Sequence, residues 1–144
     1  MSGRYQVYEH GEMDHWGEYY GGLSEASMAP GRHFLEKDMD LEFFGVSLNS
    51  RLPGEGAEYW HAHSVLEELY IFLEGKGELA LDDEIIPVQA GTAVRVGQGV
   101  MRTWRASPDS PVPLKWICIR AGGDKLANIP RGAAPLRDRP LPWK

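Results

Sequence analysis

Short β-forming segments follow one another from residue 41 to residue 120, and their regular spacing constrains the fold more than any other feature of the chain. Strands that recur every ~8–12 residues with turn residues between them are typical of all-β sandwiches and barrels. No helical period of useful length competes, so we expect an all-β fold with very little helix. The segments are Leu41–Leu48, Glu58–His63, Glu68–Leu73, Glu78–Leu81, Glu84–Val88, Thr92–Val96, Met101–Ala106 and Leu114–Arg120.

The length of 144 residues suits a single domain with a sizeable core. We expect residues 33–120 to form that domain as a β-barrel. Residues 1–32 carry aromatic side chains without clear periodicity, which predicts an arm that packs on the barrel. His10, His15 and His33 lie in irregular segments without partner spacing and are assigned no role. Residues 121–144 are rich in Pro, Arg and Gly, which predicts an extended or partly disordered tail.

Charge and hydropathy argue against several kinds of partner. The net charge of −6 disfavours nucleic acid. No apolar run approaches the ~20 residues of a membrane helix, and the N-terminal residues lack a signal-peptide pattern, so we expect a cytoplasmic protein without a membrane partner. The single cysteine, Cys118, lies in an apolar run and is interpreted as a buried, inert thiol.

Potential metal ligands gather around one predicted turn. His61 and His63 are two residues apart, so on a strand both rings point to the same face. Glu68 begins the next β-forming segment. Two histidines and one carboxylate form a ligand set that suits iron, manganese, zinc or nickel. The alternative is a polar pair that lines the barrel and hydrogen-bonds to Glu68 and water.

Alternation along the strands predicts which side chains line the interior. Counting from Glu68, Tyr70 and Phe72 point inward, and counting from Arg102, so does Trp104. Phe72 is expected to be core. Tyr70 and Trp104 flank the polar cluster, and their phenol and indole N–H groups make them candidate ligand-binding residues.

The segment Glu68–Leu73 is apolar on both faces. Leu69, Ile71 and Leu73 point away from the inward set, yet they are also apolar. A barrel strand that is buried on both faces needs a second layer outside it. The N-terminal arm or a second subunit could supply this layer. We expect a homodimer, because exposed apolar patches usually mark interfaces.

The chain resembles the cupin superfamily, whose small jelly-roll barrels carry two sequence motifs. The first motif is G-x5-H-x-H-x(3,4)-E-x6-G, and its matching residues here are His61, His63, Glu68 and Gly75. Glu55, with a glycine on either side, stands at its leading position. The resemblance covers about residues 41–120, and it implies a cupin-type jelly roll with a metal held by the two histidines and the glutamate.

The second cupin motif, G-x5-P-x-G-x2-H-x3-N, is incomplete in this chain. Gly91 and Gly99 match it, whereas Gly97, Arg102 and Ala106 stand at its proline, histidine and asparagine positions. The resemblance thus implies that this chain has three of the four metal ligands that the two motifs supply. A guanidinium is always protonated and has no lone pair for a metal, so an arginine cannot replace the histidine as a ligand.

Arg102 leaves three outcomes open at this stage. It pairs with Glu68 as an internal ion pair, it binds a carboxylate or phosphate of a ligand, or it swings outward without a role. As an anion binder it joins Tyr70 and Trp104 as a candidate ligand-binding residue.

Three functional hypotheses follow. The first is a metal-dependent enzyme, an isomerase, epimerase or dioxygenase, that acts on a small anionic metabolite. The second is a metal-free enzyme in which His61 or His63 is a general base beside Glu68. The third is a binding or sensing module for a small anion, without catalysis. Sequence does not separate them, because fold does not fix function.

Overall fold

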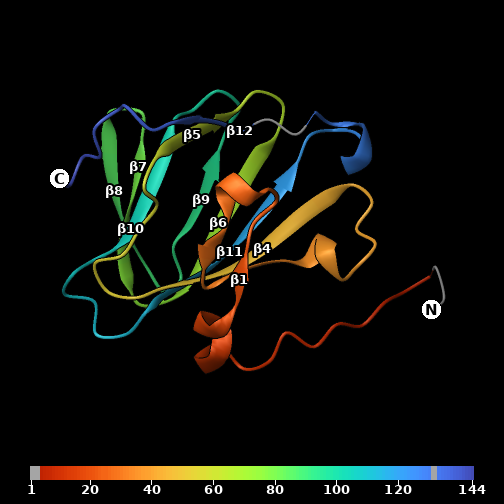
Figure 1. The fold of residues 1–144 in the computed structure, drawn as a ribbon, viewed down its shortest axis with the longest axis horizontal. Coiled ribbons are helices and arrows are strands. Elements are labelled where there is room, and N and C mark those ends of the chain that lie inside the picture. Colours follow the sequence, from red (N-terminus) through yellow and green to blue (C-terminus); the bar gives the residue numbers. More distant parts are fainter. Residues whose placement is uncertain (1–3, 131–132) are drawn as a thin grey trace.

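The computed structural model describes residues 4–130 and 133–144, and its body is built on two five-stranded antiparallel sheets that face each other (Figure 1). In spatial order, the first sheet contains β3 (Arg32–Phe34), β4 (Phe44–Arg51), β11 (Leu114–Ala121), β6 (Glu67–Glu74) and β9 (Ala93–Val96). The second contains β12 (Ala133–Leu136), β5 (Trp60–His63), β10 (Arg102–Ala106), β7 (Lys76–Leu81) and β8 (Glu84–Gln89). The predicted jelly-roll fold class is confirmed.

The β-forming segments of the sequence all become strands, and the largest difference is at β4. This strand begins at Phe44 rather than Leu41 and ends at Arg51 rather than Leu48. Pairing explains the shift, because β4 is in register with the whole of β11, from Phe44 opposite Ala121 to Arg51 opposite Leu114. The last residues of β4 are therefore polar. The sequence did not predict them as part of the strand, because that prediction relied on apolar side chains.

Helical structure in the described part of the chain is limited to short 3-10 helices. They are η1 (Met13–Glu18), η2 (Glu25–Ser27), η3 (Leu35–Lys37) and η4 (Leu126–Asn128). Among them η3 alone lies within residues 33–120, so the barrel has as little helix as predicted. No helix among the described residues is long and apolar enough to cross a membrane.

Both ends of the chain pack on the barrel. Near the N-terminus, η1 lies against β4 and buries Trp16, while β1 (Tyr20–Gly21) pairs with β2 (Ala29–Pro30). Near the C-terminus, β12 pairs with β5 and widens the second sheet, and the Trp60 indole donates a hydrogen bond of 3.0 Å to the Pro140 carbonyl. The sequence did not predict β3 or β12, which are too short to show a period.

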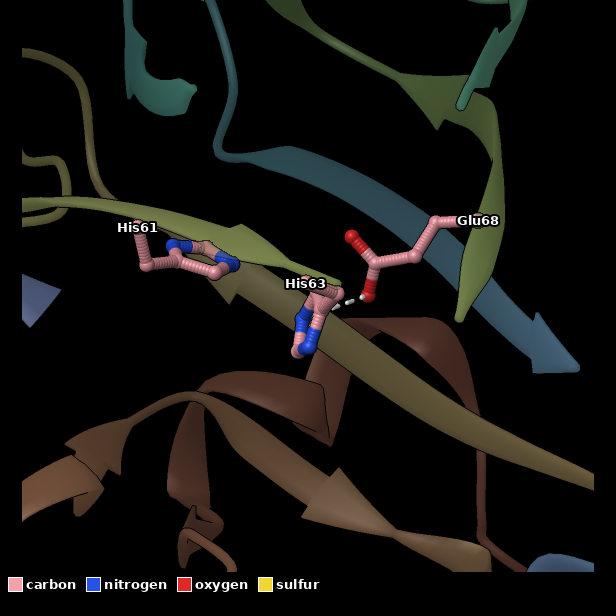
Figure 2. A group of neighbouring side chains, drawn as sticks. All are labelled: His61, His63 and Glu68. Atoms are coloured by element: carbon pink, nitrogen blue, oxygen red, sulfur yellow. Dashed lines mark ion pairs between the residues drawn. The ribbon is translucent and has the colours of Figure 1, made fainter. Parts of the chain in front are cut away.

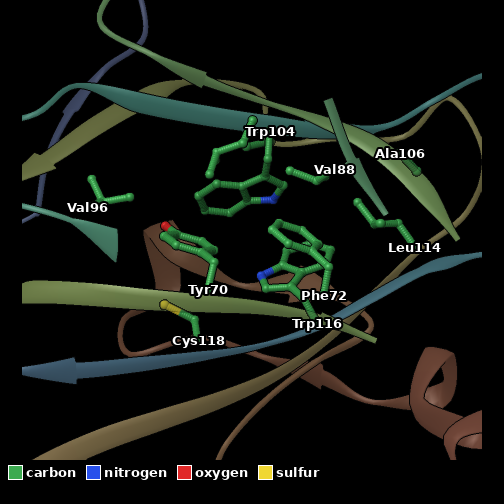
Figure 3. Close-up of a cluster of buried hydrophobic side chains, with 11 residues drawn as sticks. Tyr70, Phe72, Val88, Val96, Trp104, Ala106, Leu114, Trp116 and Cys118 are labelled. Atoms are coloured by element: carbon green, nitrogen blue, oxygen red, sulfur yellow. The ribbon is translucent and has the colours of Figure 1, made fainter. Parts of the chain in front are cut away.

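The core lies between the two sheets and is rich in aromatic rings (Figure 3). Tyr70 and Phe72 point inward from β6, as alternation predicts, and are 2% and 1% exposed. They meet Trp104 from the opposite sheet and Trp116 from β11, whose ring centroids lie 5.9 Å apart in an edge-to-face arrangement. Such pairs add stability beyond the area that they bury.

Gly75 forms the sharp turn between β6 and β7. Its φ of 82° lies in the left-handed region, which favours glycine. A Cβ atom at this position would lie 2.6 Å from the Pro113 carbonyl oxygen. The glycine that matches the first motif is therefore required both by backbone conformation and by close packing, and it sets the hairpin that follows Glu68.

The outer face of β6 is only partly covered. Leu69 is 37% exposed, and Ile71 and Leu73 are half-buried. Ile117 and Ile119 of β11 lie opposite Ile71 and Leu69, so the apolar strip continues across the two strands. The helix η1 packs on β4, which lies on the other side of β11 from β6.

An aromatic stack that sequence reasoning did not find holds the arm against the first sheet. The His10 ring stacks on Tyr19 at 4.1 Å and on His33 at 5.3 Å, and Tyr8 stacks on His33 at 5.5 Å. His33 in turn forms an ion pair with Asp38. Burial, together with the neighbouring His33, lowers the pKa of His10 to about 4.

Acidification should loosen this arm. A released arm has an ordinary histidine pKa of 6.5, whereas the docked His10 has a pKa of about 4, so docking weakens as the pH falls from 6.5 towards 4. Hydrogen-exchange protection of the amides of residues 10–20 should therefore decrease across this range. The variant His10→Phe keeps the stack without a titrating group and should lose the pH dependence. An equal decrease in both proteins would contradict the assignment.

Candidate functional site

The two histidines and the glutamate of the first motif meet where the two sheets approach each other (Figure 2). His61 and His63 project from the same face of β5, and Glu68 projects towards them from β6. One ligand atom from each of the three side chains lies within 4.8 Å of the others. His61 is 8% and Glu68 is 4% exposed. Strand alternation and one short turn are enough to bring these groups together.

The Glu68 carboxylate is surrounded by donors. Arg102 Nη1 donates a hydrogen bond to its Oε1, and the Tyr70 hydroxyl donates a second one of 2.9 Å to the same oxygen. Its Oε2 accepts a contact of 3.4 Å from Cys118 Sγ and lies 3.5 Å from His63 Nε2. Arg102 and Tyr70 thus saturate one oxygen and leave the other facing the histidines.

The protonation states suit a ligand set. Burial lowers the pKa of His61 to about 3, and burial is also the main cause that lowers the pKa of His63. Burial by itself would raise the pKa of Glu68, but interactions with His63, Arg102, His61 and Tyr70 outweigh it and lower the pKa to about 2. At neutral pH the two imidazoles are therefore neutral and the carboxylate is ionised, as metal binding requires.

One of the three separations between potential ligand atoms matches that of a bound metal, and all three atoms lie within 4.8 Å of one another. Adjacent ligand atoms in a tetrahedral site with bonds of ~2.1 Å lie about 3.4 Å apart, and His63 Nε2 lies 3.5 Å from Glu68 Oε2. The Nδ1 atoms of His61 and His63 are buried and have no hydrogen-bond partner among the described residues. Each histidine thus has a nitrogen that the protein itself leaves unused.

Arg102 takes the first of the three outcomes considered above. Its side chain is fully enclosed and forms an ion pair with Glu68. Its remaining N–H groups donate to the Val100 carbonyl at 2.9 and 3.2 Å and, more weakly, to the Gly97 carbonyl at 3.4 Å. This arrangement favours an internal ion pair between the sheets over a role in binding a ligand.

A cavity of about 1300 Å³ opens beside the three potential ligands. Tyr70 and Trp104, the two aromatic residues singled out in the sequence, both line it. Trp104 meets His61 edge to face at 5.3 Å, and its indole Nε1 has no hydrogen-bond partner among the described residues. Cys118 also lines the cavity, where burial raises the pKa of its thiol and keeps it unreactive.

Two arginines in this cavity escaped sequence reasoning. Arg32 begins β3 and Arg51 ends β4, and both line the cavity. The usable signal was the alternation of Ser47, Asn49 and Arg51, which places three polar side chains on one face of a strand. Arg32 lay in the predicted arm, where no period marked it as part of a sheet.

The ion pair between Arg102 and Glu68 should be a main source of stability. Arg102→Met leaves a buried carboxylate without its partner and should lower the free energy of unfolding by about 3–5 kcal/mol. The double variant Arg102→Met/Glu68→Gln should regain part of the lost stability, because neither member of the pair then leaves a charge buried. Urea unfolding of the three proteins measures both effects. Arg105→Met, which breaks a half-exposed pair with Glu78, is the control and should cost about 1 kcal/mol.

Comparisons with known proteins agree with the fold and the site. The family model described as Cupin domain matches residues 50–120. A cupin protein from Bacteroides fragilis is 34% identical with a TM-score of 0.61, over 72% of this chain and 85% of that one. A putative sugar phosphate isomerase from Acidithiobacillus ferrooxidans is 25% identical with a TM-score of 0.57, over 73% and 67%.

A third structure, a protein with a double-stranded β-helix domain from Klebsiella pneumoniae, has the same fold at 17% identity and a TM-score of 0.56, over 68% of this chain and 78% of that one. No curated protein matches the chain.

Proposed function

The chain belongs to the cupin family, and from this premise we propose that it is a metal-dependent enzyme of the isomerase, epimerase or dioxygenase type that acts on a small anionic metabolite. The observation that carries the proposal is the convergence of His61, His63 and Glu68, with ligand atoms within 4.8 Å of one another, on the wall of a large cavity. The likeness to a putative sugar phosphate isomerase supports a phosphorylated or otherwise anionic substrate.

Each residue of the site has a distinct task in this proposal. His61, His63 and Glu68 would hold iron, manganese, zinc or nickel, which when bound supplies a Lewis acid. Arg102 and Tyr70 keep the Glu68 carboxylate ionised and fixed in direction. The Trp104 ring would form part of the wall against which the ligand packs. The aromatic walls exclude water from this end of the cavity.

The electrostatics favour an anionic substrate. Arg102 neutralises the charge of Glu68, Arg120 pairs with Glu36, and Arg32 and Arg51 add positive charge to the same cavity. An anion is therefore attracted to the site more strongly than a free cation of the same size. The same charge balance weakens metal binding relative to a site with four neutral or anionic ligands.

This charge balance is also the observation that favours a second candidate, a metal-free module that binds a small anion. If the chain is such a module, the ion pair between Arg102 and Glu68 takes the structural place of a metal. A metal-free general base is less well supported, because a histidine with a pKa of about 3, as for His61, is a weak base at neutral pH.

Metal titration separates the two candidates. The parent protein, stripped with chelator, should bind one equivalent of manganese, iron or zinc, and its free energy of unfolding should rise by about 2.7 kcal/mol at a hundredfold excess over Kd. His63→Gln removes one ligand and should abolish the rise. His33→Gln, a histidine in the aromatic stack of the arm, is the matched control and should behave like the parent.

A further variant tests how the residue at position 102 affects metal binding. Arg102→His supplies a lone pair and removes a positive charge, so it should bind the same metals more tightly than the parent. Failure of both proteins to take up metal, even at millimolar concentration, would leave the anion-binding module as the function of this fold.

We also propose a homodimer formed through the outer face of β6. The supporting observation is the apolar strip around Leu69, which continues onto Ile117 and Ile119 of β11. Isolated apolar side chains are normal on protein surfaces, whereas contiguous strips usually mark interfaces.

A charge placed in this strip should dissociate the dimer. Leu69→Asp would bury a carboxylate without a partner at the interface, so the mass from light scattering after size exclusion should fall to that of one chain. Ile85→Asp is the control, because Ile85 is 45% exposed on β8 in the other sheet. A parent protein that is already monomeric at micromolar concentration would contradict the proposal.

A further inference from the structure

Two arginines, one from β3 and one from β4, face the cavity without a carboxylate to pair with. We propose that Arg32 and Arg51 form a subsite for a doubly charged oxyanion, and that it binds the phosphate-like end of the ligand. The proposal deepens the function proposed above, because it assigns one end of the ligand of that same cavity. It does not depend on whether a metal is bound at His61, His63 and Glu68.

The register of the sheet places the two guanidinium groups together. Arg32 pairs with Asn49 across β3 and β4, so these two side chains lie on the same face. Arg51 is two residues beyond Asn49 along β4 and therefore shares that face as well. All three residues line the cavity. The arrangement presents two cations and one amide to the same region of space.

Gly31 makes this close approach possible. Its φ is +69°, and a Cβ atom there would lie 1.9 Å from the Ser50 carbonyl oxygen. The Gly31 carbonyl accepts a hydrogen bond of 2.7 Å from the Ser50 amide, which ties the residue before Arg32 to the residue before Arg51. The backbone thus fixes the positions from which both side chains enter the cavity.

The charges of these two arginines are not compensated by the described part of the protein. Arg32 has one side-chain hydrogen bond, from Nη1 to the Ser27 carbonyl at 3.1 Å, and no side-chain hydrogen bond or ion pair from Arg51 is observed. Other arginines on barrel strands each pair with a glutamate: Arg95 with Glu67, Arg102 with Glu68, Arg105 with Glu78 and Arg120 with Glu36. Charges that are partly shielded from water are normally paired, so two such arginines without a carboxylate partner on one cavity wall favour an anionic ligand.

The pKa values of both arginines are lowered by their surroundings. Burial lowers the pKa of Arg32, and burial together with the charge of Arg32 lowers the pKa of Arg51. Glu55 and Glu58 act on Arg51 in the opposite direction, but neither forms an ion pair with it. A guanidinium nevertheless stays protonated in proteins. Two such charges side by side match a dianion better than a monoanion, and their forked N–H groups suit phosphate oxygens.

Trp104 links this subsite to the potential metal ligands. Arg32 Cζ lies 5.8 Å from the centroid of the Trp104 ring, and the same ring lies 5.3 Å from His61. Arg32 and His61 therefore both lie against the same indole ring. A small organic phosphate can place its phosphate at the arginines and extend its body along Trp104 towards His61 and Glu68.

Calorimetric titration with inorganic phosphate tests the subsite in chelator-treated protein at constant ionic strength. At about pH 8 phosphate is mostly a dianion, and the parent should bind it at least tenfold more tightly than acetate. Arg51→Gln and Arg32→Gln should each weaken phosphate binding by about tenfold or more, because each removes a charge-assisted contact. Arg95→Gln removes the same charge from an exposed pair with Glu67 and should leave phosphate binding unchanged.

Two further measurements keep the outcomes distinct. His63→Gln should still bind phosphate, so a failure of the metal proposal leaves this subsite standing. Arg51→Gln without ligand should melt at the same or a higher temperature than the parent, because it removes an unpaired charge, whereas an arginine with a purely structural role would lower it. Equal phosphate affinity in the parent and in Arg51→Gln, acetate binding as tight as phosphate, or no binding at tens of millimolar would each overturn the proposal.

Discussion

The ion pair between Glu68 and Arg102 is the interaction on which the rest of the site depends. It joins β6 of one sheet to β10 of the other through a carboxylate and a guanidinium that are 4% and 0% exposed. A pair buried so deeply stabilises a fold only when its remaining donors and acceptors are satisfied. The Val100 carbonyl, the Tyr70 hydroxyl and the Cys118 thiol meet that condition.

The same pair shapes the chemistry of the cavity. One oxygen of Glu68 is committed to Arg102 and Tyr70, and the other is left for the histidines. The arginine also neutralises the charge of Glu68 on this wall of the barrel, and Arg32 and Arg51 add positive charge to the same cavity. A histidine at position 102 would give a site with a fourth ligand and a different preference for the charge of its ligand.

The sequence predicted the parts of the molecule that depend on local pattern. Alternation placed Tyr70, Phe72 and Trp104 in the interior, and the spacing of His61, His63 and Glu68 brought them to one place. Turn residues located the strands, apart from the shifted ends of β4. These features have a period or a fixed spacing, so they can be recognised in the sequence alone.

The remaining features arise from pairing between distant segments, which no local pattern records. Arg32 reaches the cavity because β3 pairs with β4, and a strand of three residues has no period to detect. The stack of Tyr8, His10, Tyr19 and His33 is assembled from three positions in irregular segments and one in the three-residue strand β3. The sequence left three outcomes open for Arg102. Its burial against Glu68 in the folded barrel selects the internal ion pair.

The position of β12 has a consequence for the order in which the site is assembled. β5 carries both histidines, and its pairing with β10 consists of one residue pair, whereas β12 lies opposite all four of its residues. Residues 133–136 follow every other strand along the chain, so the histidine strand remains a nearly free edge until this last segment docks. The two imidazoles thus lie on a strand whose longest backbone pairing is with the last strand of the chain.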